Sequence, residues 1–212
     1  MTTTLAPPRM TVDEYFALEM ATEYPNEYRA GEIVPIDRTE FRVSLIKVPL
    51  LVALRSSAEN GGFESFLSFR VRIPAVDAYL YPDVIMVADG GRFMSHGETD
   101  TILDPVLVID VLSERPSHAD PEWRAEAYRT LDTIREYVLV ASDRPHAEVY
   151  RRGPDGEWVL AEARAGLEES ITLASIGTTV ALAAIYTQVR EFIADSAPDA
   201  KQSPVRETRE NG

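Results

Sequence analysis

Two aspartates stand beside or inside apolar segments, where a charged side chain is unexpected. Asp83 follows Pro82 and opens the apolar run Val84–Ala88. Asp110 interrupts a second apolar run, Val106–Leu112. Each run is typical of a strand that is buried on both faces of an α/β sheet. A buried carboxylate is costly unless it is hydrogen-bonded, paired with a cation or bound to a metal. Two such carboxylates on neighbouring strands predict a shared ligand, and a divalent metal ion is the first candidate.

The composition narrows the chemistry that is open to this chain. It has 212 residues, 45% hydrophobic and 26% charged, which suits one domain with one sizeable core. Cysteine is absent, so disulfides, zinc–thiolate sites and thiol nucleophiles are excluded. The histidines His96, His118 and His146 are scattered, which disfavours a zinc site or a histidine-based triad. No apolar run is long enough to cross a bilayer and no signal pattern is present, so we expect a cytoplasmic protein.

The distribution of charge bears on possible partners. A net charge of −14 opposes long-range attraction to nucleic acid, although a local basic strip can act on an acidic protein. Arg70 and Arg72 lie at period two and are the best candidates for a strip that faces phosphate. Of the 21 basic residues only Lys47 and Lys201 are lysines. Chemistry that ordinarily needs lysine must here use arginine or go without it.

Local signals at the beginning of the chain predict a helix and then a hairpin. Thr11 as N-cap and Glu14 three residues later form a capping-box pattern, which predicts a helix that runs to Leu18. The pair Ala30-Gly31 predicts the turn of a hairpin. Residues 1–10 are rich in Thr and Pro, and we expect them to be disordered.

The middle of the chain predicts a second helix followed by strands. Apolar residues at helical spacing predict a helix over residues 39–57, in which Pro49 predicts a kink or a break. Strands are expected over Phe63–Phe69 and Val71–Ile73, before the strand that Asp83 opens. The segment Asp89–Pro105 contains three glycines and is expected to be an irregular loop.

The C-terminal part predicts a helix, a strand, a hairpin and a closing helix. Asp120-Pro121-Glu122 predicts the beginning of a helix that runs to about Leu131. Residues 182–193 predict the closing helix, and residues 196–212 are expected to be a disordered tail. Together these elements predict one α/β domain with a mixed sheet over residues 11–195. The expected strands here are 136–140, 146–151 and 157–161, with a Gly153-Pro154-Asp155-Gly156 turn between the last two.

The order of these elements and several short motifs resemble the PD-(D/E)xK nuclease superfamily, which has a restriction-endonuclease-like fold. Within it the chain resembles the bacterial Uma-type (Uma-two) family of proposed restriction endonucleases. The resemblance implies a restriction-endonuclease-like core with flanking helices and a C-terminal antiparallel hairpin extension. The motifs that carry it are Met10–Tyr15, Glu27–Ile33, Val71–Pro74, Tyr81–Val84, Asp104–Ser113, Tyr128-Arg129 and Arg135–Val140.

The resemblance implies a metal site for phosphodiester hydrolysis. Asp83, Asp110 and the backbone carbonyl of Val111 correspond to the metal ligands of the superfamily. Glu27 corresponds to a position that often carries a further acid, although glutamates beside glycine turns are commonly just exposed. Strands lie roughly 4.8 Å apart, so two carboxylates on adjacent strands could bind one ion. Oxygen ligands suit Mg²⁺ or Mn²⁺.

Two positions depart from the pattern that this resemblance implies. The family usually has glutamate where this chain has Asp110, a substitution that the superfamily pattern allows. The superfamily lysine would stand at Leu112, and the family moves it to the position of Arg124. Arginine can hold a phosphate and stabilise negative charge, but it stays protonated and cannot act as a general base. On a helix, Arg124 could also be a solvated charge or an i, i+4 partner of Tyr128.

Three functions are therefore open. The first is a metal-dependent DNA endonuclease with Asp83 and Asp110 as metal ligands and Arg124 as phosphate clamp. The second is a catalytically eroded nuclease fold that is kept for dimerisation or partner binding. The third is a hydrolase of small phosphorylated molecules, which an acidic surface would hinder less than it hinders DNA binding. Superfamily precedent implies a homodimer.

Overall fold

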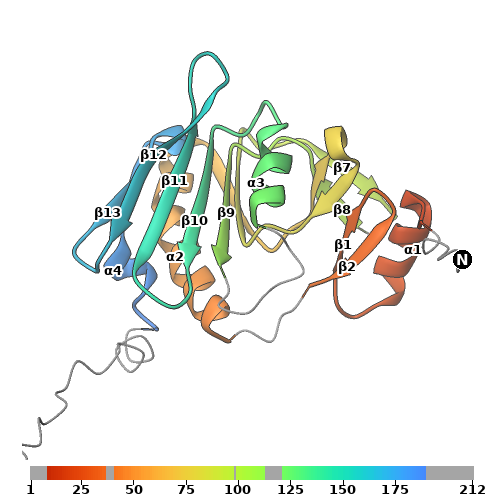
Figure 1. Ribbon diagram of the computed structural model, residues 1–212, viewed down its shortest axis with the longest axis horizontal. Helices are drawn as coiled ribbons and strands as arrows, with labels where there is room; N and C mark the ends of the chain where they lie inside the picture. The colour runs from red at the N-terminus through yellow and green to blue at the C-terminus, as the bar shows by residue number, and fades with distance from the viewer. Residues whose placement is uncertain (1–8, 37–40, 98, 113–120, 190–212) are drawn as a thin grey trace, which may run out of the picture.

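The computed structural model describes residues 9–36, 41–97, 99–112 and 121–189. Its largest sheet has six strands in the order β12-β11-β10-β9-β6-β3 (Figure 1). β9 and β10 run parallel, whereas every other neighbouring pair in this sheet is antiparallel, so the sheet is mixed as predicted. The strands are β3 (Phe63–Leu67), β6 (Val84–Ala88), β9 (Leu107–Leu112), β10 (Glu136–Ala141), β11 (His146–Arg152) and β12 (Trp158–Ala165).

A second sheet comes mainly from the N-terminal half of the chain. Its order is β2-β1-β5-β4-β8-β7, and it lies beside helix α1 (Val12–Ala21), away from β12 and β13 (Figure 1). The hairpin at Ala30-Gly31 forms as predicted, with Arg29 paired with Glu32. The strands are β1 (Asn26–Arg29), β2 (Glu32–Pro35), β4 (Val71–Ile73), β5 (Ala78–Leu80), β7 (Phe93–His96) and β8 (Thr99–Ile102).

The large sheet is covered on both faces at its central strands β6, β9 and β10, which explains why those strands are mostly apolar. Helix α2 (Phe41–Gly61), helix α4 (Leu182–Ile185) and the hairpin β13–β14 pack on one face. Helix α3 (Pro121–Arg129) and residues of the second sheet pack on the other face (Figure 1). Along β6, Val84 and Met86 face the first core, whereas Ile85 and Val87 face the second. Hairpin β13 (Ser170–Leu173) and β14 (Thr178–Ala181) completes the fold.

Helix α3 connects the two parallel strands β9 and β10. Parallel neighbours cannot be joined by a tight turn, and a crossover helix is the usual connection. This crossover places α3 against the face of β9 on which Val108 lies, because Ala127 and Tyr128 share a core with Val108. Side chains of α3 that point inward therefore meet the same face of the sheet.

The capping box at the N-terminal helix is confirmed. The Thr11 hydroxyl accepts the Glu14 amide, and the Glu14 carboxylate accepts the Thr11 amide. Just before the helix, the amide of Met10 donates to the carbonyl of Gly31 over 2.8 Å. Residues 1–8, for which disorder was expected, and the expected tail at 196–212 lie outside the described residues. The closing helix, expected over residues 182–193, is shorter than predicted, because α4 ends at Ile185 and residues 186–189 form a turn.

Of the two outcomes predicted at Pro49, a break does not occur, because α2 continues through Pro49 as one helix. Pro49 removes one helical hydrogen bond at a cost of about 3 kcal/mol. It lies on a half-exposed flank where water can satisfy the freed carbonyl. The fully buried side chains of Ile46, Leu50 and Leu54 hold both halves of the helix against the sheet, and their burial outweighs that cost.

The prediction that Asp89–Pro105 is an irregular loop was wrong. Phe93 pairs with Ile102 and His96 pairs with Thr99, which makes β7 and β8 a hairpin. The glycines do occupy the turns, and Gly91 has a φ of +64° that favours glycine. The residues between those turns still pair as strands, so glycine content alone misled the prediction. Within the described residues no helix is long and apolar enough to cross a membrane.

Candidate functional site

Asp83 lies just before β6 and joins that strand to β9. Its carboxylate oxygen Oδ2 accepts the backbone amide of Val111 over 2.6 Å. Its other oxygen forms an ion pair with the ammonium of Lys47 on α2. Burial raises the pKa of Asp83 above its ordinary range, and the charge of Asp110 adds to the rise, whereas Lys47 opposes it. We call Asp83 and Lys47 the lysine pair.

Asp110 lies in the middle of β9, on the face that α3 covers. Arg124 donates to it with two nitrogens, Nε to Oδ2 over 3.0 Å and Nη2 to Oδ1 over 3.1 Å. The hydroxyl of Tyr137 on β10 donates to the same Oδ2 over 2.9 Å. Asp110 is therefore a buried carboxylate whose two oxygens are both satisfied by protein groups, which makes its burial affordable.

Arg124 is the centre of the site, because three segments of the chain converge on its guanidinium. In addition to its fork on Asp110, Nη1 forms an ion pair with Glu27, and Nη2 donates to the hydroxyl of Tyr128 over 2.8 Å. Burial would lower the pKa of Arg124, but Asp110 and Glu27 outweigh burial and raise it well above its ordinary value. Arg124 is thus a permanent cation. We call Glu27, Asp110, Arg124, Tyr128 and Tyr137 the arginine network.

Glu27 on β1 is buried rather than exposed, with 3% of its surface accessible. Its oxygen Oε1 faces Arg124 and accepts the Tyr81 amide over 3.1 Å, and Oε2 accepts from Arg29 over 2.7 Å. Burial tends to raise the pKa of Glu27, but the ion pairs with Arg124 and Arg29 outweigh burial and lower it. Glu27 is therefore held ionised between two arginines.

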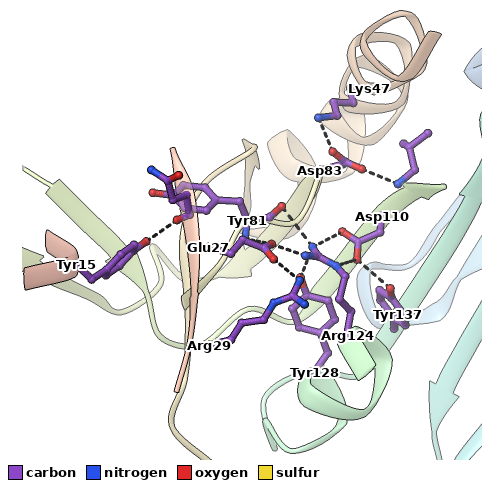
Figure 2. A network of polar contacts seen from close by, with 12 residues as sticks. Tyr15, Glu27, Arg29, Lys47, Tyr81, Asp83, Asp110, Arg124, Tyr128 and Tyr137 are labelled. Carbon is purple, nitrogen blue, oxygen red and sulfur yellow. Dashed lines mark hydrogen bonds and ion pairs between the residues drawn. The ribbon is translucent and has the colours of Figure 1, made fainter. Parts of the chain in front are cut away.

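The four side chains singled out in the sequence come together at one place. Figure 2 shows Glu27 and Asp110 meeting on the guanidinium of Arg124, with Tyr128 and Tyr137 below, while Asp83 lies above them and faces Lys47 and the Val111 amide. They come from both sheets and from α3. Val111 also lies at this place, because its backbone amide donates a hydrogen bond to the Asp83 carboxylate.

Sequence reasoning offered Tyr128 as an i, i+4 partner of Arg124, which the structure confirms, but it missed the contributions of Lys47 and Tyr137 to this site. Tyr137 gave no sequence signal beyond its apolar neighbourhood, and burial raises the pKa of both tyrosine hydroxyls well above the ordinary value. Lys47 did carry a signal, since it is one of only two lysines in the chain and lies next to the buried Ile46 on a helix. That signal could have marked it as a site candidate.

The prediction that Arg70 and Arg72 form a phosphate-facing strip was wrong. Arg70 is 3% exposed, donates to Thr101 over 2.8 Å and lies over the ring of Phe16. Arg72 donates to Asp77 over 2.8 Å and lies over the ring of Tyr79. Both guanidiniums therefore serve the packing of the second sheet, because period two in sequence did not put them on a solvent-facing strand face.

The donor set at Asp83 and Asp110 fits a magnesium ion in its chemistry. Within the described parts of the chain, no group of three or more His, Cys, Asp or Glu side chains is arranged to hold a metal. Mg²⁺, however, is commonly bound by one or two carboxylates together with waters and substrate phosphates. The carboxylates of Asp83, just before β6, and Asp110, on β9, meet that requirement. In this structure Lys47 and Arg124 balance their negative charges.

Comparisons with known proteins agree with this architecture. A crystal structure titled as that of "a putative nuclease belonging to DUF820" from Anabaena variabilis ATCC 29413 superposes with a TM-score of 0.64 and 19% identity, covering 85% of this chain and 99% of that one. This likeness shows the fold. The uncharacterized protein sll1609 of Synechocystis sp. (strain ATCC 27184 / PCC 6803 / Kazusa) is 29% identical over 161 residues, covering 72% of this chain and 86% of that protein. The uncharacterized protein slr1290 of the same organism is 27% identical over 180 residues, covering 84% of this chain and 92% of that protein.

A family model named Uma2 and described as "Putative restriction endonuclease" matches residues 12–183. The match includes every side chain of the arginine network and both members of the lysine pair. The fold predicted from the sequence, a mixed α/β restriction-endonuclease-like core, is thereby confirmed. Since the match covers most of the described chain, this protein belongs to the Uma2 family.

Proposed function

We propose that this protein is a metal-dependent endonuclease of the PD-(D/E)xK type that hydrolyses phosphodiester bonds in DNA. The observation that carries the proposal is that two carboxylates lie near each other at neighbouring strands: Asp83, just before β6, accepts the amide of Val111, the residue that follows Asp110 on β9. Membership of a family described as restriction endonucleases supports the substrate class.

In this proposal Asp83 and Asp110 would hold Mg²⁺ or Mn²⁺, and the Val111 carbonyl would supply a third oxygen. A bound divalent ion would activate water and offset charge on the phosphate. Glu27 is not a metal ligand in this proposal, although its position in the sequence suggested a further acid of the metal site. Its two oxygens are engaged by Arg124, Arg29 and the Tyr81 amide, so it acts as the counterion of Arg124 rather than as a metal ligand.

In this proposal Arg124 positions Asp110 and takes no part in proton transfer. Hydrolysis forms a bond from the water oxygen to phosphorus and breaks one ester P–O bond, and a proton from the water ends on the departing sugar oxygen. Arg124 cannot take that proton because it is always charged. Its bidentate fork instead fixes the rotamer of Asp110, so that metal binding in this proposal would share the Asp110 oxygens with Arg124.

The test is nicking of supercoiled plasmid DNA in Mg²⁺ or Mn²⁺ by the full chain. We expect Asp83→Ala and Asp110→Ala to abolish cleavage, because each removes a proposed ligand. The matched control is Asp132→Ala, since the side chain of Asp132 is fully exposed to solvent. Cleavage by Asp83→Ala at the rate of the control would contradict the proposal. Duplex DNA and free nucleotides are assayed side by side to separate a nuclease from a hydrolase of small molecules.

A second candidate is an eroded nuclease fold that is kept for partner binding. The observation that favours it is the fully engaged guanidinium of Arg124, which stands where the family pattern has lysine. If cleavage appears only after Arg124→Lys, this candidate is supported. Robust cleavage by the wild-type chain excludes it.

We also propose that the protein is a homodimer. Helix α2 exposes Phe41, Val48 and Val52, at spacings of seven and four residues that put them on one side of a helix. Light scattering should give twice the chain mass, and Val48→Asp with Val52→Asp should give the monomer. A wild-type monomer at micromolar concentration would remove this part of the proposal.

A further inference from the structure

Lys47 brings to the site a cation that neither the sequence motifs nor the family description assigns. It lies on α2 in an ion pair with Asp83, and its ammonium also donates to the hydroxyl of Ser68 over 3.3 Å. The other lysine, Lys201, lies outside the described residues. Lys47 is therefore the one lysine in the described part of the chain, and it contacts a site carboxylate.

Arg124 is poorly placed to contact a phosphate. Its nitrogens donate to Asp110, Glu27 and the Tyr128 hydroxyl, and its side chain is only 10% exposed. Reaching a phosphate would separate it from two buried carboxylates, and leaving buried charges unpaired is strongly unfavourable. A planar guanidinium also matches a carboxylate with two parallel bonds, which is the geometry that Arg124 has with Asp110.

Lys47 differs from Arg124 in each of these respects. Its side chain is 22% exposed, and its partners among the described residues, Asp83 and Ser68, use two of its three N–H groups. An ammonium on a flexible four-carbon stem can turn from one acceptor to another at little cost. Asp83, in turn, keeps the Val111 amide as a partner when Lys47 turns away.

We infer that Lys47 is the catalytic cation of the site, which contacts a non-bridging oxygen of the scissile phosphate, while Arg124 is a positioning residue. This inference rests on the proposed nuclease function. Lys47 takes no proton in this step; its charge offsets the negative charge that grows on the phosphate as the water oxygen adds. The position that carries the cation in the family pattern is Arg124 here, whereas the residue that contacts the phosphate is Lys47.

The experiment compares Lys47→Met, Lys47→Arg and the charge-matched control Arg92→Met. Arg92 pairs with Asp104 on the surface and its side chain is 69% exposed. Binding of a labelled DNA duplex is followed by fluorescence anisotropy across a salt series, in EDTA and in Ca²⁺. Loss of one phosphate contact should reduce the slope of log Kd against log salt by about one for Lys47→Met, and Lys47→Arg should keep the slope.

Cleavage in Mg²⁺ gives a second readout. Removing one charged donor from a reacting group costs about 10²–10³ in kcat. We expect a loss of that size for Lys47→Met, with little change in KM, and at least tenfold recovery in Lys47→Arg. Circular dichroism melts establish that each variant folds, so that a loss of rate is not a loss of structure.

Failure of the inference and failure of the proposed function give different results. If the wild type cleaves DNA and Lys47→Met matches Arg92→Met in both readouts, the Lys47 inference is overturned and the nuclease stands. If the wild type does not cleave but the salt slope still falls in Lys47→Met, the phosphate contact is supported and hydrolysis is not. Absence of both binding and cleavage overturns both.

Discussion

The arginine network and the lysine pair balance their carboxylates in opposite ways. In the arginine network, two acids share one guanidinium, and every charged group is nearly or fully enclosed. In the lysine pair, a single ammonium faces a single acid, and both side chains keep some contact with solvent, at 22% and 16% exposure. The network is built as a fixed scaffold, whereas the pair can exchange its partner. This difference fits the roles proposed above, in which the arginine network positions Asp110 and Lys47 of the lysine pair contacts the phosphate.

The largest difference should appear when each cation is removed. Arg124→Ala leaves Glu27 and Asp110 buried without their shared partner, and we expect a loss of about 3–5 kcal/mol in the free energy of unfolding. Lys47→Met breaks a partly solvated pair and should change stability by no more than about 1 kcal/mol. Urea unfolding at pH 7 measures both. Equal losses of stability in the two variants would show that the arginine network and the lysine pair stabilise the fold to the same extent.

The acid limb of the stability curve sharpens the comparison. The pKa of Glu27 is lowered in the fold from its ordinary value of 4.5, so its stabilising effect is complete above that value and is lost as the pH falls through the lowered pKa. We expect Glu27→Gln to lose about 1.5–3 kcal/mol at pH 7 and to flatten the wild-type decline in acid. Glu14→Gln is the control, because Glu14 also has a lowered pKa but lies exposed at the helix cap. An unchanged acid limb in Glu27→Gln would show that its ion pairs contribute nothing to the fold.

A smaller effect should follow from removing one hydroxyl of the arginine network. Tyr137→Phe deletes the donor to Asp110 and leaves the guanidinium fork in place, so we expect a loss of about 1 kcal/mol. Tyr24→Phe, on the surface at 61% exposure, should be neutral. Chemical denaturation of the two variants side by side measures the difference. A neutral Tyr137→Phe would mean that the fork alone satisfies Asp110.

The smallest predicted effect has the opposite sign. The pKa of Asp83 is raised by burial and by Asp110, so its ionised form costs stability above the raised pKa. Wild-type stability should therefore gain a small contribution as the pH falls from neutral through that pKa. In EDTA, Asp83→Asn should remove this gain and should be as stable as wild type at pH 7, or slightly more stable. A loss of stability as large as that of Asp110→Asn would contradict the distinction between the lysine pair and the arginine network.

Much of the fold could be predicted because local signals and tertiary packing agree. The capping box at Thr11, the turn at Ala30-Gly31 and the helix that begins at Pro121 all formed where their residue types favoured them. Pro49 and the glycines of Asp89–Pro105 misled the prediction because burial of α2 and pairing of β7 with β8 overrode local preference. Hairpin β13–β14 was missed, as its residues 170–181 gave no strong turn signal.

The candidate site was only partly predictable. Asp83, Asp110, Arg124 and Glu27 were identified from motifs, and they meet in space. Their partners could not be read from the sequence, because which cation faces which acid depends on how α2 and the second sheet pack on β6 and β9. Lys47 and Asp83 are a clear example: their separation in sequence gives no hint of contact.

The arginine network also has a consequence for how the protein folds. Arg124 and Glu27 are 97 residues apart in sequence, and they belong to segments that pack against different sheets. Their ion pair can close only after β1 has docked beside the β9–α3–β10 crossover, and contacts of such long sequence separation are costly to form early. The arginine network is therefore complete only once the second sheet has docked, so a chain in which that sheet is incomplete would leave Arg124 with Asp110 as its one acidic partner among the described residues.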